Sequence, residues 1–314
     1  MTTIINGLHH ITAITDNAAA TGQFFSKVLG LRLVKRTVSE DDTAGYHICF
    51  GNKAGDDGTL LTFFPREHSD AGRIGAGQAT IIQLSIPGGA LRFWRTRLRQ
   101  NNCNHIVDET LFGDDRALFQ FPSGLLVAFV ECESDDRTPW PTEDVDSDVA
   151  IRGLYGITLA QQSTAHLPTL LTQTFGYVET DVEQITTTTQ QRFVLPNSDA
   201  GVIDVQIDPN MIRGRQGTGT IHHFALSVGS PAEQLEMRQA LIDAGMQVTD
   251  VIDLQYFTTV RARTPGGILI EIATTHNRGF TIDEPIERLG EDLCLPPDLE
   301  HKRPEIESKL PPLL

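Results

Sequence analysis

The sequence of 314 residues lacks several features that define whole classes of protein. No apolar run approaches the roughly 20 residues that a membrane-spanning helix needs, so no membrane span is expected. The first residues, MTTIINGLHH, show no charged segment followed by an apolar one, which argues against a secretory signal. Basic residues are few: 25 lysines and arginines stand against 41 acidic residues, and a net charge of −16 repels nucleic-acid phosphates.

Cysteine is also scarce, and no CxxC pair occurs, so a zinc ribbon is not supported. The four cysteines are Cys49, Cys103, Cys132 and Cys294. Free thiols are typical of a reducing cytoplasm, where we expect the protein to reside. The composition, 39% hydrophobic and 21% charged, is that of a soluble globular protein, and the length allows two domains.

The chain repeats one order of elements four times. Four short apolar runs follow a glycine-containing turn, which is typical of strands: DGTLLTFF, SGLLVAFV, AGVIDVQI and GGILIEIA. Another strand-like segment precedes each run: LHHITAI, TIIQLSI, LYGITLA and IHHFALSV. A helix-like stretch lies between them. The first has Asp16 or Asn17 as cap and Gly30 as terminator, and the fourth has Ser230, Pro231 and Gly245 in the corresponding places.

Each unit therefore predicts a β-α-β-β-β module, and four modules predict an α+β fold of two paired-module domains with curved mixed sheets around a cavity. The modules span residues 7–66, 77–131, 153–208 and 218–275. We expect the pairs to follow chain order, with modules one and two in one domain and three and four in the other. The domains would span 1–134 and 152–280, with an acidic linker at 135–151 and a C-terminal extension at 281–314.

Alignment of the modules shows which positions are polar in only some copies. The equivalent first-strand positions are His10, Ile81, Gly156 and His223, and the last-strand positions are Thr62, Ala128, Val205 and Glu271. Only modules one and four therefore provide residues that can bind a metal. Two imidazoles and one carboxylate suit Fe(II) with open coordination positions, although zinc accepts the same ligands.

Strand alternation selects between the neighbouring histidines of each pair. In IHHFALSV, Phe224 and Leu226 pattern as the helix-packed face, which places His222 with them and His223 on the concave face. The same alternation places Glu271 on the concave face and groups His10 with Thr12. The six other histidines are outside the predicted site: His47 and His276 near it, and His68, His105, His166 and His301 in surface contexts.

The motifs GLHHITAIT, GTIHHFALSV, TPGGILIEIATTHNRGFT and the ending LGEDLCLPPDLEHKRPEIESKLPPL resemble those of the vicinal oxygen chelate superfamily. The resemblance is to its ring-cleaving dioxygenase branch, related to hydroquinone dioxygenases, and it runs from about residue 7 to the C-terminus. It implies Fe(II), sometimes Mn(II), held by His10, His223 and Glu271, the three residues that alternation selects.

The resemblance also implies supporting roles near the substrate hydroxyl and oxygen for His9, Thr12 and His222. Alternation places His9 and His222 on the other face, so the two lines of reasoning differ on these residues. The sequence departs from the branch where it has Leu254 and Arg261 in place of an expected Arg and Tyr. Arg261 keeps a cation nearby, and Tyr256 is the candidate for the missing phenol.

These features predict a ring-cleaving dioxygenase that acts on a hydroquinone- or catechol-type diol with O2. Two alternatives stay open: a glyoxalase-type isomerase or thiol transferase, and a metal-free protein that binds an aromatic compound. The isomerase would want a fourth protein ligand, for which Thr62 is a poor candidate. The expected partners are a small aromatic molecule and O2, with neither nucleic acid nor membrane, and homo-oligomer formation is left open.

Overall fold

The computed structural model describes residues 4–39, 42–67, 69–103, 105–163, 166–275 and 279–313. His68 and His276 lie outside the described residues. None of the described helices combines the length and apolar character that crossing a membrane requires.

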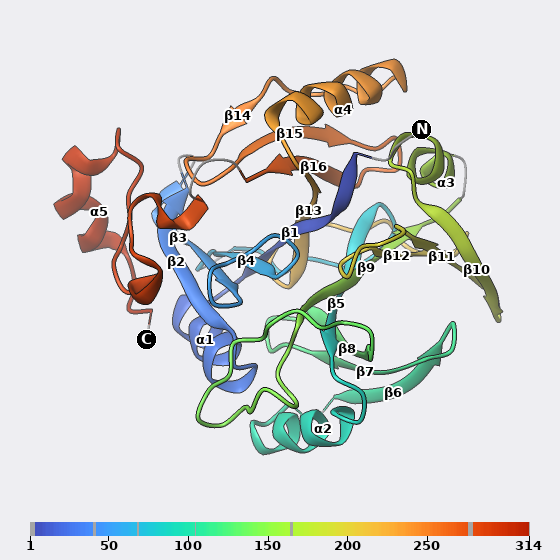
Figure 1. The fold of residues 1–314 in the computed structure, drawn as a ribbon, viewed down its shortest axis with the longest axis horizontal. Coiled ribbons are helices and arrows are strands. Elements are labelled where there is room, and N and C mark those ends of the chain that lie inside the picture. The colour runs from blue at the N-terminus through green and yellow to red at the C-terminus, as the bar shows by residue number, and fades with distance from the viewer. Residues whose placement is uncertain are drawn as a thin grey trace.

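Two mixed sheets of eight strands each form the framework (Figure 1). The first sheet has the order β14 (Ile252–Asp253), β15 (Thr258–Arg263), β16 (Leu269–Thr274), β13 (Thr220–Val228), β1 (Ile5–Thr15), β4 (Leu60–Pro65), β3 (Asp42–Gly51) and β2 (Arg32–Ser39). The second sheet has the order β10 (Val178–Ile185), β11 (Thr188–Val194), β12 (Val202–Ile207), β9 (Gly153–Gln161), β5 (Gln78–Ile86), β8 (Leu126–Glu131), β7 (Asp114–Gln120) and β6 (Ile106–Leu111). The α+β class and the two paired-module sheets are confirmed.

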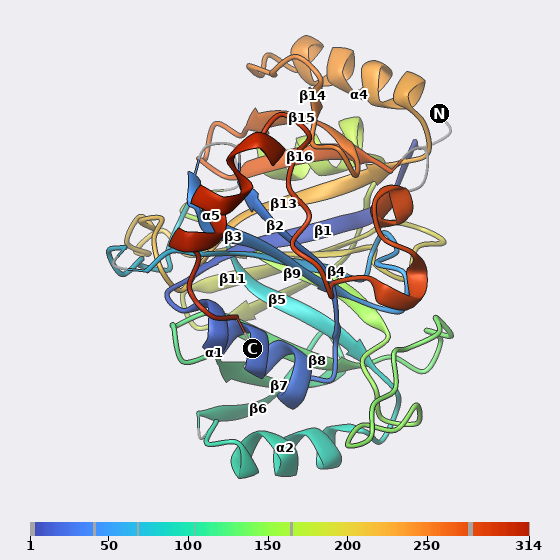
Figure 2. The ribbon, with the colours of Figure 1, turned by 90° about the vertical axis from the view of Figure 1, so that its left-hand side faces the viewer.

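Each module contributes one helix. These are α1 (Ala18–Gln23, continued by a π-helical turn at Phe24–Val28), α2 (Leu91–Gln100), α3 (Leu167–Thr169, continued at Leu170–Thr174) and α4 (Pro231–Asp243). Figures 1 and 2 show α4 and α2 at opposite ends of the molecule, α4 over β15 and β16 and α2 beside β6, β7 and β8. The C-terminal part adds short 3-10 turns at Gly279–Ile282, Ile286–Arg288 and Glu300–Lys302, and α5 (Arg303–Lys309).

Local capping signals explain where the helices begin and end. The side chain of Asn17 accepts a hydrogen bond from the backbone N–H of Ala20, and Ser230 caps α4 in the same way, as predicted. On α4, Met237 and Leu241 are buried, whereas Leu235 is 55% exposed. Buried Gln234 instead faces the sheet, where its amide donates to the carbonyls of β15 and β16.

The modules do not pair in chain order. β1 of module one pairs antiparallel with β13 of module four, and β5 of module two pairs with β9 of module three. The first sheet therefore combines modules one and four, and the second sheet combines modules two and three. A domain boundary at residues 135–151 would divide both sheets. The expected pairing of one with two and three with four is wrong.

Strand register identifies the equivalent positions. His223 pairs with Thr12 as Gly156 pairs with Gln83, which supports the first-strand alignment. On the last strands, Glu271 lies beside Ala225, whereas the corresponding residue beside Thr158 is Asp204. The predicted equivalence of Val205 to Glu271 is therefore wrong by one residue.

The chain beyond β16 returns to the first sheet. Figure 2 shows this segment and α5 lying over β2 and β3. A backbone bridge joins Leu293 to Arg36 of β2, and the N–H of Cys294 donates to the Arg36 carbonyl at 2.9 Å. The C-terminal extension is thus packed against the concave side of module one, where the site lies.

Candidate metal centre and active-site cavity

Three side chains from three adjacent strands converge in the first sheet. His10 on β1, His223 on β13 and Glu271 on β16 place one donor atom each within 4.8 Å of the others. The two Nε2 atoms are 3.1 Å apart, and Oε1 of Glu271 lies 3.4 Å from Nε2 of His223. All three side chains are buried, and their convergence follows from the pairing of β1 with β13 and of β13 with β16.

These donors open into a cavity of about 620 Å³. Thr12 and Arg261 also line it, so the structure brings these two predicted residues to the site. Much of the remaining wall is apolar, including Phe64 and Phe257. Mostly apolar walls with a few converging polar groups are typical of a small-molecule binding site.

The second histidine of each pair faces the cavity, and the first stands behind it. Nδ1 of His9 contacts Nδ1 of His10 at 2.9 Å, and Nδ1 of His222 contacts Nδ1 of His223 at 2.8 Å. Neither His9 nor His222 lines the large cavity, in agreement with strand alternation. The doubled histidine thus pairs a cavity-facing ring with a ring that can fix its orientation.

His9 continues into a further hydrogen-bonded group on the far side of the wall. Its Nε2 lies 2.7 Å from Oγ1 of Thr275 and 3.2 Å from Oδ1 of Asp57. Asp57 also accepts hydrogen bonds from Thr275 and from Ser227. Burial lowers the pKa of His9, although the Asp57 carboxylate acts in the opposite direction.

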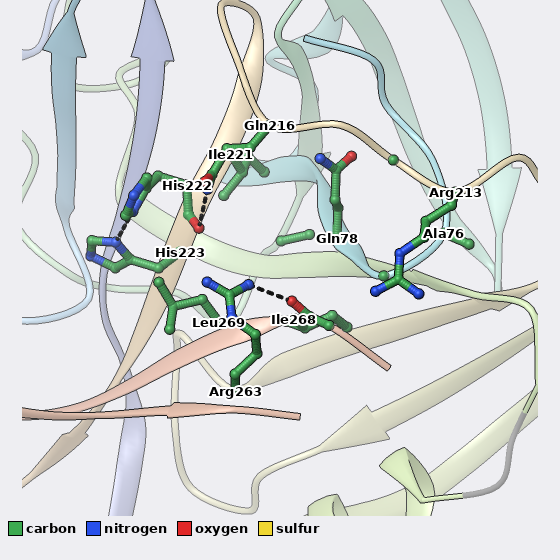
Figure 3. A pocket seen from close by; sticks show the side chains of 14 residues that line it. Ala76, Gln78, Arg213, Gln216, Ile221, His222, His223, Arg263, Ile268 and Leu269 are labelled. Atoms are coloured by element: carbon green, nitrogen blue, oxygen red, sulfur yellow. Dashed lines mark hydrogen bonds between the residues drawn. The ribbon is translucent and has the colours of Figure 1, made fainter. Parts of the chain in front are cut away.

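His222 faces a different space, a cavity of about 140 Å³ between the two sheets. Figure 3 shows its ring bonded to His223, with the guanidinium groups of Arg213 and Arg263 around the same cavity. Burial lowers the pKa of His222 to about 4, and the positive charge of the nearby Arg66 acts in the same direction. This imidazole is therefore neutral at pH 7.

The Glu271 carboxylate is held in place by its neighbours on β15. Arg261 donates from Nε to Oε1 at 2.8 Å, and the Thr259 hydroxyl donates to Oε2 at 3.0 Å. Each oxygen keeps free lone pairs, because each accepts only one of these bonds. The carboxylate can therefore bind a cation without losing these two partners.

The protonation states of the histidines fit a bound cation. Burial lowers the pKa of His10 and of His223 well below the ordinary value, so both imidazoles are neutral. If each ring carries its single proton on Nδ1 and donates it to the histidine behind, each Nε2 has a free lone pair. The two Nε2 atoms lie 3.1 Å apart. A metal ion between them satisfies both lone pairs and the carboxylate, so this donor set fits a divalent metal.

The second sheet keeps the carboxylate but not the histidines. Asp204, the counterpart of Glu271, accepts hydrogen bonds from Arg192 Nε at 2.8 Å and Gln83 Nε2 at 2.9 Å. Arg192 stands beside Asp204 as Arg261 stands beside Glu271. The positions of the two imidazoles are held by Ile81 and Gly156, and the described residues of this sheet form no group of side chains that could hold a metal.

Two predicted residues have more limited roles in the geometry. The Thr12 hydroxyl contacts Nε2 of His223 at 2.9 Å and Oγ1 of Thr62 at 2.7 Å, so it borders the metal position. Tyr256 lines the cavity, but its hydroxyl donates to Asp283 at 2.8 Å. Burial raises the pKa of Tyr256, and the negative charge of Asp283 acts in the same direction, so the phenol stays protonated.

Three residues of the site were not predicted from the sequence, and His47 has a larger part in the site than predicted. His47 lines the cavity, its Nε2 is buried without a hydrogen-bond partner among the described residues, and burial lowers its pKa to about 4. His47 and Cys49 are two residues apart on one strand and therefore share a face, which could have indicated that His47 faces the cavity. No sequence signal marks Thr259, Asp57 or Thr275, which meet the site only through tertiary contacts.

The chain belongs to the glyoxalase/bleomycin resistance protein/dioxygenase superfamily, whose family model matches residues 7–129. It is 37% identical over 308 residues to "Putative ring-cleaving dioxygenase MhqE" of Bacillus subtilis (strain 168), covering 98% of this chain and 99% of that protein. It is 32% identical over 314 residues to "Chlorohydroquinone/hydroquinone 1,2-dioxygenase" of Sphingobium indicum, covering 96% and 95%. A crystal structure titled "putative dioxygenase" from Bacillus subtilis superposes with a TM-score of 0.94 at 36% identity, covering 99% and 98%.

Proposed function

We propose that the protein is a non-haem Fe(II)-dependent dioxygenase that cleaves the ring of a hydroquinone- or catechol-type diol with O2. One observation carries the proposal: His10, His223 and Glu271 converge at the wall of a largely apolar cavity of about 620 Å³. The names of the full-length relatives support the same reaction. Mn(II) suits the same three ligands and is the second metal to test. The free cysteines support a reducing, cytoplasmic setting.

His10, His223 and Glu271 would hold the metal, with a proton on the Nδ1 of each histidine. A bound Fe(II) supplies open coordination positions for a phenolate and O2 and takes part in electron transfer to O2. His9 and His222 keep the ligand rings oriented, and Arg261 and Thr259 orient the carboxylate.

The remaining walls bind and orient the aromatic ring. Phe64 and Phe257 provide apolar contacts that exclude water from the site. The free Nε2 of neutral His47 can accept or donate one hydrogen bond, which suits a hydroxyl of the diol. Because the Tyr256 hydroxyl is bonded to Asp283, we assign Tyr256 to the wall rather than to proton transfer.

The fourth equivalent position argues against the isomerase. A glyoxalase-type site would want a fourth acidic or amide ligand there, but the residue is Thr62, whose hydroxyl is bonded to Thr12. A metal-free binding protein would not need three buried donors held by hydrogen bonds from behind. The dioxygenase accounts for both observations.

The test is metal binding and O2 uptake after anaerobic reconstitution with Fe(II) or Mn(II). We expect one metal per chain and O2 uptake with hydroquinones or catechols, and loss of both in His223→Ala. The matched control is His301→Ala, since His301 is exposed in the C-terminal extension. A protein that binds neither metal would refute the proposal, and metal binding with turnover of a hemithioacetal but no O2 uptake would favour the isomerase.

A further inference from the structure

Lys35 on β2 is a fully buried cation outside the metal centre. Its side chain has 0% exposure, and Nζ donates to Asp283 Oδ1 at 2.6 Å and Glu284 Oε2 at 2.5 Å. Cys294 Sγ lies 3.5 Å away. Asp283, Glu284 and Cys294 have donor atoms close enough to hold a metal, but the ammonium group of Lys35 fills that position.

All of these polar partners belong to the C-terminal extension. Burial acts to lower the pKa of Lys35, but the hydrogen bonds with Asp283 and Glu284 outweigh it and leave the pKa raised. The lysine therefore stays charged, and it needs its partners because an unpaired buried charge is strongly destabilising. Glu284 in turn accepts from the backbone N–H groups of Gly290 and Asp292, which fixes the fold of this part of the extension.

The same contacts reach the cavity wall. Asp283 accepts hydrogen bonds from Tyr256 and from Gln255, two cavity-lining residues that precede β15. The ammonium of Lys35 lies 4.9 Å from the centroid of the Tyr256 ring. Lys35 thus connects β2, the segment before β15 and the C-terminal extension, three parts of the chain that border one cavity.

The extension itself supplies one wall of that cavity. Its contribution consists of Ile282, Pro296, Pro297 and Asp298, and Phe280 lines the cavity directly before it. Asp253 and Asp298, both exposed, are acidic groups of the lining. Among the described residues of the lining, Arg261 is the one guanidinium or ammonium group, and it is paired with Glu271. A carboxylate on the substrate ring would meet two like charges and no free cation there.

We propose that the C-terminal extension, held by Lys35, is the specificity-determining wall of the cavity, and that it selects diols with uncharged, apolar ring substituents over carboxylated ones. This inference rests on the proposed function, since it concerns the substrate of the same cavity. Lys35 acts as a positioning residue, because its contacts are with the wall and not with the metal ligands.

The first test compares wild type with Lys35→Arg and with the neutral triple variant Lys35→Met/Asp283→Asn/Glu284→Gln, which leaves no buried charge unpaired. We expect KM for methylhydroquinone to rise about 10- to 100-fold in the triple variant, with a smaller change in kcat and an unchanged metal Kd. Lys35→Arg should recover part of the affinity. Faster proteolytic cleavage within 281–313 should accompany the higher KM. Unchanged KM in a folded triple variant would overturn the role of Lys35.

The second test concerns charge. Wild type should favour methylhydroquinone over 2,5-dihydroxybenzoate in kcat/KM by more than about tenfold, and Asp298→Asn should reduce that ratio as added salt does. Equal rates in wild type, or a ratio that Asp298→Asn leaves unchanged, would overturn the proposed selection. Calorimetric binding of 4-methylphenol and 4-hydroxybenzoate to metal-loaded protein separates the two proposals. If wild type lacks O2 uptake but still prefers the neutral phenol, the proposed function fails and the selective wall stands.

Discussion

Replacing His9 by phenylalanine removes the group that, in the proposed site, orients the metal ligand His10, and it keeps the shape of the core. The His9 ring is fully buried and packs on Phe257 with centroids 4.9 Å apart, a contact that phenylalanine preserves. What is lost is the Nδ1 acceptor that lies 2.9 Å from Nδ1 of His10. His10 is then free to carry its proton on Nε2, where the proton occupies the lone pair that would bind the metal.

The expected size of this effect follows from the general role of hydrogen-bond partners behind metal-bound histidines. Loss of a hydrogen-bond partner behind a metal-bound histidine costs about 10- to 100-fold in metal affinity. That range corresponds to about 1.4–2.7 kcal/mol. His222→Phe should cost a similar amount, because His222 contacts His223 at 2.8 Å in the same geometry. Thr275→Val should cost less, since it touches only the far nitrogen of His9.

The assay is anaerobic competition for Fe(II) or Mn(II) with a chromophoric chelator, with circular dichroism to show that each variant is folded. His10→Ala sets the scale, because it removes the ligand itself. If His9→Phe binds metal within twofold of wild type while His10→Ala does not bind, the Nδ1 contact does not orient His10 and the reasoning is refuted.

Three other predictions follow from neighbouring contacts. Arg261→Met removes the donor to Glu271 and should lower metal affinity by about tenfold in the same competition assay, with partial recovery in Arg261→Lys; no recovery would contradict an electrostatic role. In the metal-free protein, His47 has a pKa of about 4 against an ordinary 6.5, so the unfolded state binds more protons between these values. The free energy of unfolding should therefore fall as pH decreases through that window, by up to about 1.4 kcal/mol per pH unit, and urea titrations of His47→Gln should show a smaller slope. Asp204→Asn leaves buried Arg192 without its main partner and should destabilise the fold by about 3–5 kcal/mol in urea without changing metal affinity, whereas reduced affinity would assign the second sheet a part in the metal site.

Local sequence determined the helix ends and most strands correctly. Asn17 and Ser230 cap their helices because a short polar side chain can reach the free N–H groups of the first turn. The burial of Gln234 on α4 could not be predicted, since it depends on hydrogen bonds to strands that the helix sequence does not show. Propensity and periodicity describe an element, but the partner of its buried face lies elsewhere in the chain.

The sequence alone, through its repeats, pointed to His10, His223 and Glu271, because only modules one and four place a histidine at the equivalent first-strand position. It could not determine which modules share a sheet. Every module exposes the edge of its first strand, and the choice of β1 with β13 depends on the complementarity of whole strand edges. The free nitrogen of His47 in the cavity, the Asp57 carboxylate behind His9 and the Lys35 contact with the extension were likewise decided by the tertiary structure. Each depends on side chains far apart in the chain, whose meeting is a property of packing and not of any local pattern.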